Sequence, residues 1–126
     1  GNDNANSVVV EITFAGRRIL LPGDLESAGL QDVLAELPRE CEVVMAPHHG
    51  SLNSRPGVFA DWCTPEWIVI SSGERVSWKP ELQDRLAEQG CQVLHTASDG
   101  AVTVRIRDGR VTVNTVHSNL ADVVAR

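Results

Sequence analysis

Two short polar segments follow apolar stretches of the sequence and carry the residues best suited to chemistry. Asp24 comes after Gly23 at the end of one apolar run, and His48 and His49 come before Gly50 at the end of another. A carboxylate and one or two imidazoles are suitable ligands for Zn²⁺ or Mn²⁺, and a carboxylate can bridge two ions held close together. These residue types favour a metal site built from Asp24 and one or both histidines.

A hydroxyl group and a serine pair extend the candidate site. Ser51 follows the histidines directly, where it could orient a ligand or meet an anion. Ser71 and Ser72 follow a third apolar run, although two serines before a glycine often form only a turn. We expect all of these side chains near the ends of strands.

Each candidate also has a simpler structural explanation. Asp24 is placed to cap a helix, which is the commonest use of an aspartate in that position. Adjacent histidines at the end of a strand often point apart, with one packed and one exposed. His95 and His117 lie in or beside expected strands, where a structural histidine is the better interpretation. Taken singly, these residues leave the choice between site and scaffold open.

Apolar periodicity predicts an α/β protein with a mixed β-sheet flanked by helices. The residues around Asp108 and Gly109 alternate strictly between apolar and polar, which is typical of a hairpin. We expect strands over 8–14, 17–22, 41–46, 67–70, 91–94, 101–106 and 110–116, and helices over 25–37, 58–62 and 79–90. Because functional sites form beyond the C-terminal ends of strands in open α/β sheets, the polar segments should converge.

Length, composition and net charge limit the classes of protein to which this chain can belong. The chain has 126 residues, 42% of them hydrophobic and 22% charged, which is typical of one soluble-type globular domain. Its apolar runs are far shorter than the twenty or so residues that span a bilayer. A formal net charge of -6 opposes a broad basic surface, so any DNA must bind locally. Surface ion pairing is the expected use of most of the arginines.

The number and spacing of the cysteines do not indicate a structural role as cross-links or metal ligands. The chain has 3 cysteines without C-x-x-C spacing, which indicates neither a disulfide scaffold nor a thiolate zinc site. Cys41 and Cys91 begin apolar runs and should be small buried side chains. Trp62, Trp67 and Trp78 should mostly pack in the core or against loops.

Four segments in this order carry a family resemblance: Asn6-Ser7-Val-Val-Val, Leu20-Leu-Pro-Gly-Asp-Leu-Glu26, Val44-Met-Ala-Pro-His-His-Gly-Ser51 and Ser98-Asp-Gly-Ala-Val-Thr-Val104. Together they resemble the second half of the metallo-β-lactamase-fold domain of ComEC-type competence proteins. The resemblance implies the second half of an αββα sandwich over 1–118, followed by a terminal tail over 119–126.

The resemblance also implies a site. Asp24 falls where the family has its bridging carboxylate, and His48 and His49 fall where it has a metal-binding histidine. These residues would be catalytic by holding two Zn or Mn ions that activate water. The implied reaction is phosphodiester hydrolysis on DNA during uptake, by a bacterial inner-membrane parent that carries this domain outside the membrane.

Two departures from the family pattern bear on activity. The His-x-His-x-Asp-His motif is absent from these residues, so the first half of the fold, upstream of Gly1, is expected to carry it. Ser77-Trp78-Lys79-Pro80 stands where such domains usually read Gly-His-Pro. Lys79 could still bind a substrate phosphate as a point charge, although it cannot replace a metal-binding histidine. The 126 residues alone are expected to be inactive.

Two alternatives stay open. The first is a degenerate, non-catalytic α/β module that serves in binding or scaffolding. In the second, the half-fold presents an uncovered core face that needs a partner, either the upstream half of the same domain or a second copy in a homodimer.

Overall fold

A computed structural model describes residues 9–23, 27–51, 55–74 and 77–116. Its strands are β1 (Val10–Phe14), β2 (Arg17–Leu21), β3 (Val43–Met45), β4 (Trp67–Ile70), β5 (Gln92–His95), β6 (Val102–Arg107) and β7 (Arg110–Thr115). Its helices are α1 (Ser27–Leu34), the 3₁₀-helix η2 (Pro47–Gly50), α2 (Pro56–Cys63), α3 (Pro80–Glu88) and the short α4 (Thr96–Asp99).

The larger sheet is mixed and has the strand order β1-β2-β3-β4-β5. β1 and β2 form an antiparallel hairpin, and each later strand pairs in parallel with its neighbour. All four residues of β4 are buried, as expected for a continuous apolar strand that is covered on both faces. β6 and β7 form a separate two-stranded antiparallel sheet.

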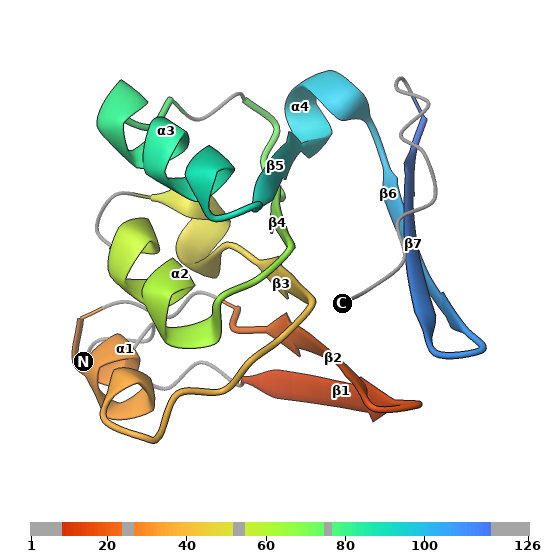
Figure 1. Ribbon diagram of the computed structural model, residues 1–126. Coiled ribbons are helices and arrows are strands. Elements are labelled where there is room, and N and C mark those ends of the chain that lie inside the picture. Colours follow the sequence, from red (N-terminus) through yellow and green to blue (C-terminus); the bar gives the residue numbers. More distant parts are fainter. Residues whose placement is uncertain (1–8, 24–26, 52–54, 75–76, 117–126) are drawn as a thin grey trace.

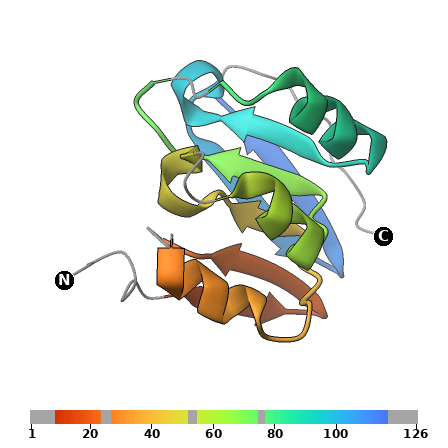
Figure 2. The same ribbon diagram turned by 90° about the vertical axis from the view of Figure 1, so that its left-hand side faces the viewer.

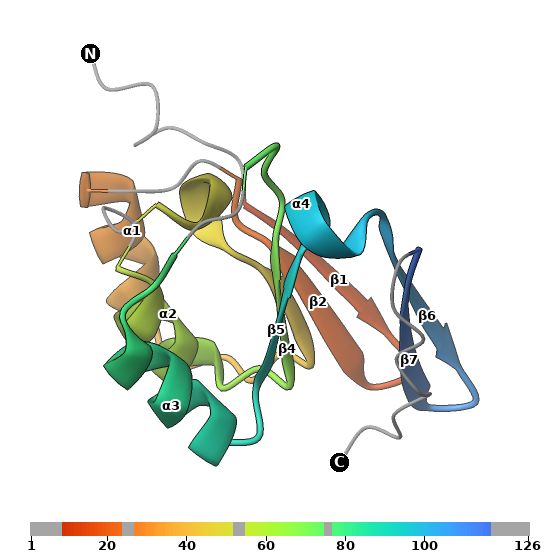
Figure 3. The ribbon, with the colours of Figure 1, turned by 90° about the horizontal axis from the view of Figure 1, so that it is seen from above.

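The molecule has three layers, seen edge-on in Figures 1 and 3. Helices α1, α2 and α3 cover one face of the large sheet, as the view from the helix side in Figure 2 also shows. The β6–β7 hairpin lies against the opposite face. The core is accordingly divided in two. Leu30, Phe59 and Leu86 pack on the helix side, whereas Trp67 and Val113 pack on the hairpin side.

The structure confirms the α/β class, the mixed sheet and the covering helices. Turn residues Asp108 and Gly109 have φ values of 53° and 74°, as a two-residue hairpin turn requires. Cys41 and Cys91 are buried, and Trp62, Trp67 and Trp78 are buried as well. The pattern of apolar residues was therefore sufficient to identify each strand and the three longer helices.

One expected helix needs correction, and one observed helix was not expected. The helix expected over 25–37 ends at Leu34, and Leu37 is 87% exposed instead of packed on an apolar face. Beyond the helix, the Glu36 carbonyl accepts a hydrogen bond of 3.1 Å from the Trp62 indole, which joins this segment to α2. Helix α4 was not expected. It begins directly after β5, and the Asp99 carboxylate accepts a hydrogen bond of 2.9 Å from the His95 amide.

Candidate functional site

The polar segments gather at one edge of the large sheet. Gly23 lies two residues beyond β2, η2 with its two histidines follows β3, and Ser71 follows β4. Because β2, β3 and β4 are neighbouring parallel strands, their C-terminal ends meet at the same edge. The topology therefore brings together the segments that the sequence singled out.

His49 has a defined orientation at this edge. Its Nδ1 atom lies 2.7 Å from the carbonyl oxygen of Ser71. Since a carbonyl oxygen can only accept, Nδ1 carries the hydrogen, and the lone pair of the neutral ring is on Nε2. The side chain is exposed, and its backbone adopts a left-handed conformation with φ of 55°. A non-glycine residue held in this region is uncommon and often marks a functional turn.

Gly50 shapes the turn that presents His49. Its φ is 82°, and a Cβ at this position would lie 3.0 Å from Cγ2 of Ile70 in β4. Its carbonyl oxygen accepts a hydrogen bond of 2.9 Å from the indole of the buried Trp78. The contact ties the segment before α3 to η2. Residue 79 is therefore held on the same side of the molecule as the histidines.

The end of β4 is fixed by Thr96, the first residue of α4. The Thr96 hydroxyl oxygen accepts a hydrogen bond of 3.0 Å from the Ser72 amide. The same hydroxyl lies 3.1 Å from the Ser72 carbonyl oxygen, to which it can donate. These bonds brace the chain beside the Ser71 carbonyl that orients His49.

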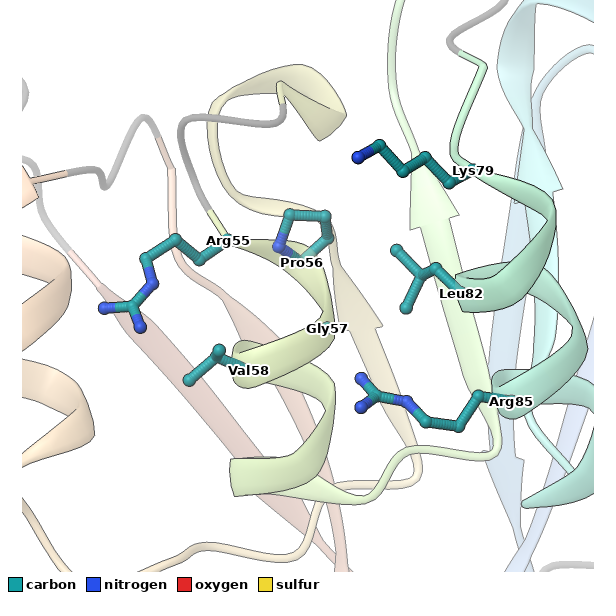
Figure 4. A pocket seen from close by; sticks show the side chains of 7 residues that line it. All are labelled: Arg55, Pro56, Gly57, Val58, Lys79, Leu82 and Arg85. Carbon is teal, nitrogen blue, oxygen red and sulfur yellow. The ribbon is translucent and has the colours of Figure 1, made fainter.

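A groove of about 350 Å³ lies between α2 and α3. Figure 4 shows Lys79, Leu82 and Arg85 pointing from α3 toward α2, whereas Arg55 turns away from the groove. Arg85 approaches α2 closely because Gly57 has no side chain, and its guanidinium lies 3.6 Å from the Asp61 carboxylate. The exposed Lys79 gives the end of the groove beside η2 a positive charge.

The five residues expected to form the site have different outcomes. Asp24 lies outside the described residues. His48 belongs to η2, but its side chain lies outside what the structure describes. His49 is exposed and oriented by Ser71, Ser51 is half-buried directly after η2, and Lys79 is exposed at the start of α3.

Sequence reasoning named Ser71 but missed the role of its carbonyl, and it missed Thr96 altogether. Neither role has a sequence signal, because backbone acceptors and braces between distant segments depend on the fold. Arg55 and Arg85 were treated only as surface arginines, yet both line the groove together with Lys79. The Arg85 side chain extends into the groove, whereas that of Arg55 extends away from it at the margin.

The donor chemistry at the edge fits a metal ion in one respect. Metal-binding histidines commonly donate their second ring N–H to a carbonyl or carboxylate, which fixes the ring and directs the other nitrogen to the ion. His49 has this arrangement. Within the described ranges, no three His, Cys, Asp or Glu residues form a group that could hold a metal ion.

The described part of the chain also contains no helix with the length and apolar character needed to cross a bilayer.

The fold and the site define a layered α/β protein with polar strand ends, and the proteins it resembles in sequence include a competence protein. The chain is 30% identical over 115 residues to the Competence protein ComA of Neisseria gonorrhoeae. It is 28% identical over 127 residues to Recombination protein 2 of Haemophilus influenzae, and 28% identical over 109 residues to ComE operon protein 3 of Bacillus subtilis. No known family profile matches the chain.

These alignments cover most of the chain and a small part of each relative. They include 87%, 98% and 83% of the chain, respectively, but only 17%, 16% and 14% of the three relatives. The chain thus spans about a sixth of the length of the curated proteins it matches. This similarity agrees with the competence-related part of the resemblance that the sequence motifs suggested.

Proposed function

We propose that this chain is the C-terminal part of a metallo-β-lactamase-like domain in a competence protein, and that the parent protein hydrolyses phosphodiester bonds of DNA during uptake. Support comes from the similarity to three competence-related proteins and from the polar strand ends of the mixed sheet. The observation that carries the proposal is His49, whose Nδ1 lies 2.7 Å from the Ser71 carbonyl oxygen.

His49 and Asp24 are the proposed metal ligands of this chain. The orientation of His49 favours it over His48, because its Nε2 lone pair suits a metal ion once Nδ1 donates to Ser71. Two Zn or Mn ions would polarise the scissile phosphate and lower the pKa of bound water. The remaining ligands would come from a His-x-His-x-Asp-His motif in the upstream half of the domain.

Ser51 and Lys79 are the proposed substrate contacts. Lys79 is exposed at the end of the groove, where its ammonium group can attract a DNA phosphate as a point charge. Ser51 follows the histidine turn and can donate a hydrogen bond to a phosphate oxygen. Both residues would act on binding, whereas Asp24 and His49 would act on the chemical step.

The test uses the full-length parent protein, its metal content and its hydrolysis of a labelled oligonucleotide. Asp24→Ala and His49→Ala should each lower metal content and reduce hydrolysis by about a hundredfold or more, as is common when a metal site is damaged. Lys79→Ala should raise KM more than it lowers kcat. The matched variant His48→Ala should retain most of the metal if His49 is the ligand. Undiminished hydrolysis in Asp24→Ala combined with His49→Ala and His48→Ala would contradict the proposal.

A second candidate is a non-catalytic binding or scaffolding module, which Lys79 favours because lysine stands in place of the histidine usual in this family. The parent would then lack the His-x-His-x-Asp-His motif upstream. Reading that sequence separates the candidates, and so does the metal content of the parent. We also propose that the parent lies in the bacterial inner membrane with this domain outside the cytoplasm.

A further inference from the structure

The β6–β7 hairpin has two faces of opposite character. Register and burial place Val104, Ile106, Val111 and Val113 toward the large sheet, where they pack in the hairpin-side core. The outward-facing residues are all polar: Thr103, Arg105, Arg107, Arg110, Thr112 and Asn114. We call this set the outer hairpin face. Figures 1 and 3 show the β6–β7 hairpin lying opposite the large sheet. Because the inward set packs against that sheet, the outer hairpin face points away from it.

Three exposed arginines concentrate positive charge on this face. Arg105 and Arg107 are two residues apart on β6, and Arg107 pairs directly with Arg110 on β7. Like charges placed directly opposite each other on antiparallel strands destabilise a hairpin. The inward-facing residues provide the hairpin's apolar contacts, and the exposed arginines do not belong to that core. An anion bound between the arginines would offset the repulsion.

The arginines of the hairpin differ from four of the described arginines elsewhere, Arg17, Arg18, Arg39 and Arg85, which form ion pairs. Arg17 pairs with Glu42, Arg18 and Arg39 both pair with Glu11, and these partners hold the guanidinium groups in ion pairs. By contrast, the side chains of Arg105, Arg107 and Arg110 make no ion pair or hydrogen bond with any residue in the described part of the chain. Among the described residues, nothing therefore occupies the donors of these three side chains.

The chemistry of the face fits a phosphate backbone. Arginine, threonine and asparagine side chains are common donors to nucleic-acid phosphates, and such contacts carry no sequence information. Alternate residues on one β-strand are spaced by about 6.8 Å, which is close to twice the ~3.4 Å rise along the helix axis between phosphates of one strand of duplex DNA. None of the outward residues is aromatic, so base stacking is not expected.

We propose that the outer hairpin face binds the sugar-phosphate backbone of DNA without sequence preference. The choice of DNA rests on the proposed function, whereas the anion-binding chemistry rests on the hairpin alone. We call the edge of the large sheet that carries η2 and its two histidines the histidine edge. The outer hairpin face is separate from it, because the Asp108-Gly109 turn lies beside the opposite end of β2. There the Arg17 side chain donates a hydrogen bond of 2.9 Å to the Gly109 carbonyl oxygen. The outer hairpin face would guide the DNA strand and take no part in hydrolysis.

The test measures binding of a fluorescein-labelled 20-nucleotide oligothymidine, and of a duplex of equal length, to the 126-residue chain by fluorescence anisotropy at 50 mM and 200 mM salt. The double variant R107Q/R110Q should weaken binding by about tenfold at low salt, because two charges that release counterions are lost. The slope of log K against log salt should fall by about 1.4 for the single strand and about 1.8 for the duplex.

The matched control is R18Q/R39Q, which removes the same charge from arginines that already pair with Glu11. This variant should bind DNA within about twofold of the unmodified chain. Thermal unfolding should show that R107Q/R110Q is at least as stable as the unmodified chain, since it removes a like-charge pair.

Three results would overturn the proposal: no DNA binding at low salt, equal losses in the test and control variants, or binding only to acidic lipid vesicles. The outcome is distinguishable from failure of the proposed function. A hairpin that binds DNA, in a parent whose hydrolysis survives removal of Asp24 and both histidines, would support this surface and contradict the metal site. Conversely, DNA binding could be unchanged in R107Q/R110Q while removal of Asp24 and both histidines abolishes hydrolysis. That result would support the metal site and contradict this surface.

Discussion

Single residues at the histidine edge have requirements that can be measured separately. Gly50 combines a positive φ of 82° with a neighbour, Cγ2 of Ile70, that would lie 3.0 Å from an added Cβ. Gly16 has a similar φ of 80°, but nothing lies within 4 Å of its Cβ position. The two glycines therefore separate the cost of backbone conformation from the cost of crowding.

Gly50→Ala should lower the free energy of unfolding more than Gly16→Ala. The left-handed backbone alone should cost about 1–2 kcal/mol in each variant. Gly50→Ala should cost roughly 1 kcal/mol more, because the methyl group presses on Ile70 in the buried strand β4. Urea unfolding of both variants measures the difference. Equal losses would show that the turn can move away from β4 without penalty.

Buried thiols should make the protein sensitive to alkaline pH. Burial raises the pKa of Cys41 to about 11, and burial raises the pKa of Cys63 further still. A thiol in the unfolded chain ionises near pH ~8.5. The folded state is therefore favoured fully below that pH, and its advantage declines as pH rises toward the folded pKa values.

Between about pH 8.5 and 11, the free energy of unfolding should fall by up to ~1.4 kcal/mol per pH unit for each thiol. Urea unfolding at a series of pH values measures this slope. Cys41→Ala should reduce the slope, although cavity formation will also lower stability at neutral pH. A slope that is unchanged in this variant would contradict a contribution from Cys41.

At the scale of elements, a buried carboxylate joins the first parallel strand pair. Glu42 is 9% exposed and stands just before β3. Its Oε2 atom accepts a hydrogen bond of 2.7 Å from the Arg18 amide in β2, and its Oε1 atom lies 3.6 Å from the Arg17 guanidinium. The side chain thus completes the pairing at the end of the sheet opposite the histidine edge.

Glu42→Ala should lower the free energy of unfolding by about 1–3 kcal/mol, because the Arg18 amide loses its acceptor. Glu42→Gln should cost less, since an amide oxygen can still accept that hydrogen bond. Glu88→Ala, at an exposed position on α3, is the matched control and should change stability by less than about 0.5 kcal/mol. Thermal or urea unfolding distinguishes the three variants. A loss in Glu42→Ala no larger than the control would show that water replaces the carboxylate.

Apolar periodicity and turn residues were sufficient to predict the elements, whereas contacts between distant segments were not predictable. β4 matched its expected bounds of 67–70, because a continuous apolar run between polar turns leaves little choice. The end of α1 was misplaced, since the apolar repeat continues to Leu37, whereas the helix ends at Leu34 and the following Glu36 carbonyl contacts the distant Trp62. Helix α4 is only four residues long and has no apolar repeat to reveal it.

The candidate site was predictable only as a set of residue types. The sequence indicated that His48 and His49 follow a strand, but adjacent residues give no reason to prefer either as a ligand. The preference for His49 arises from the Ser71 carbonyl, 22 positions away in the sequence. Any residue type can supply a backbone carbonyl acceptor, so this contact could be identified only from the folded structure.

At the scale of the whole molecule, the second sheet covers only part of the first. The hairpin-side core includes residues from β3, β4 and β5, with Ile19 of β2 packed at its margin. Val10, Ile12 and Phe14 alternate along β1 and are 43%, 43% and 59% exposed. Since Ile12 pairs with Ile19, these side chains share the hairpin-side face of the sheet. The edge strand therefore presents an apolar face that the β6–β7 hairpin leaves uncovered.

An exposed apolar edge strand favours association with another protein surface. We expect the 126-residue chain to self-associate through this face, and Ile12→Ser combined with Phe14→Ser to shift it toward monomer with little change in unfolding free energy. Leu37→Ser is the matched control, because Leu37 is 87% exposed on a separate segment and should leave association unchanged. Sedimentation velocity over a wide range of concentrations measures the effect. A chain that is monomeric throughout that range would show that the face does not recruit a second copy, and β1 pairing with the rest of the parent protein would then be the arrangement to test.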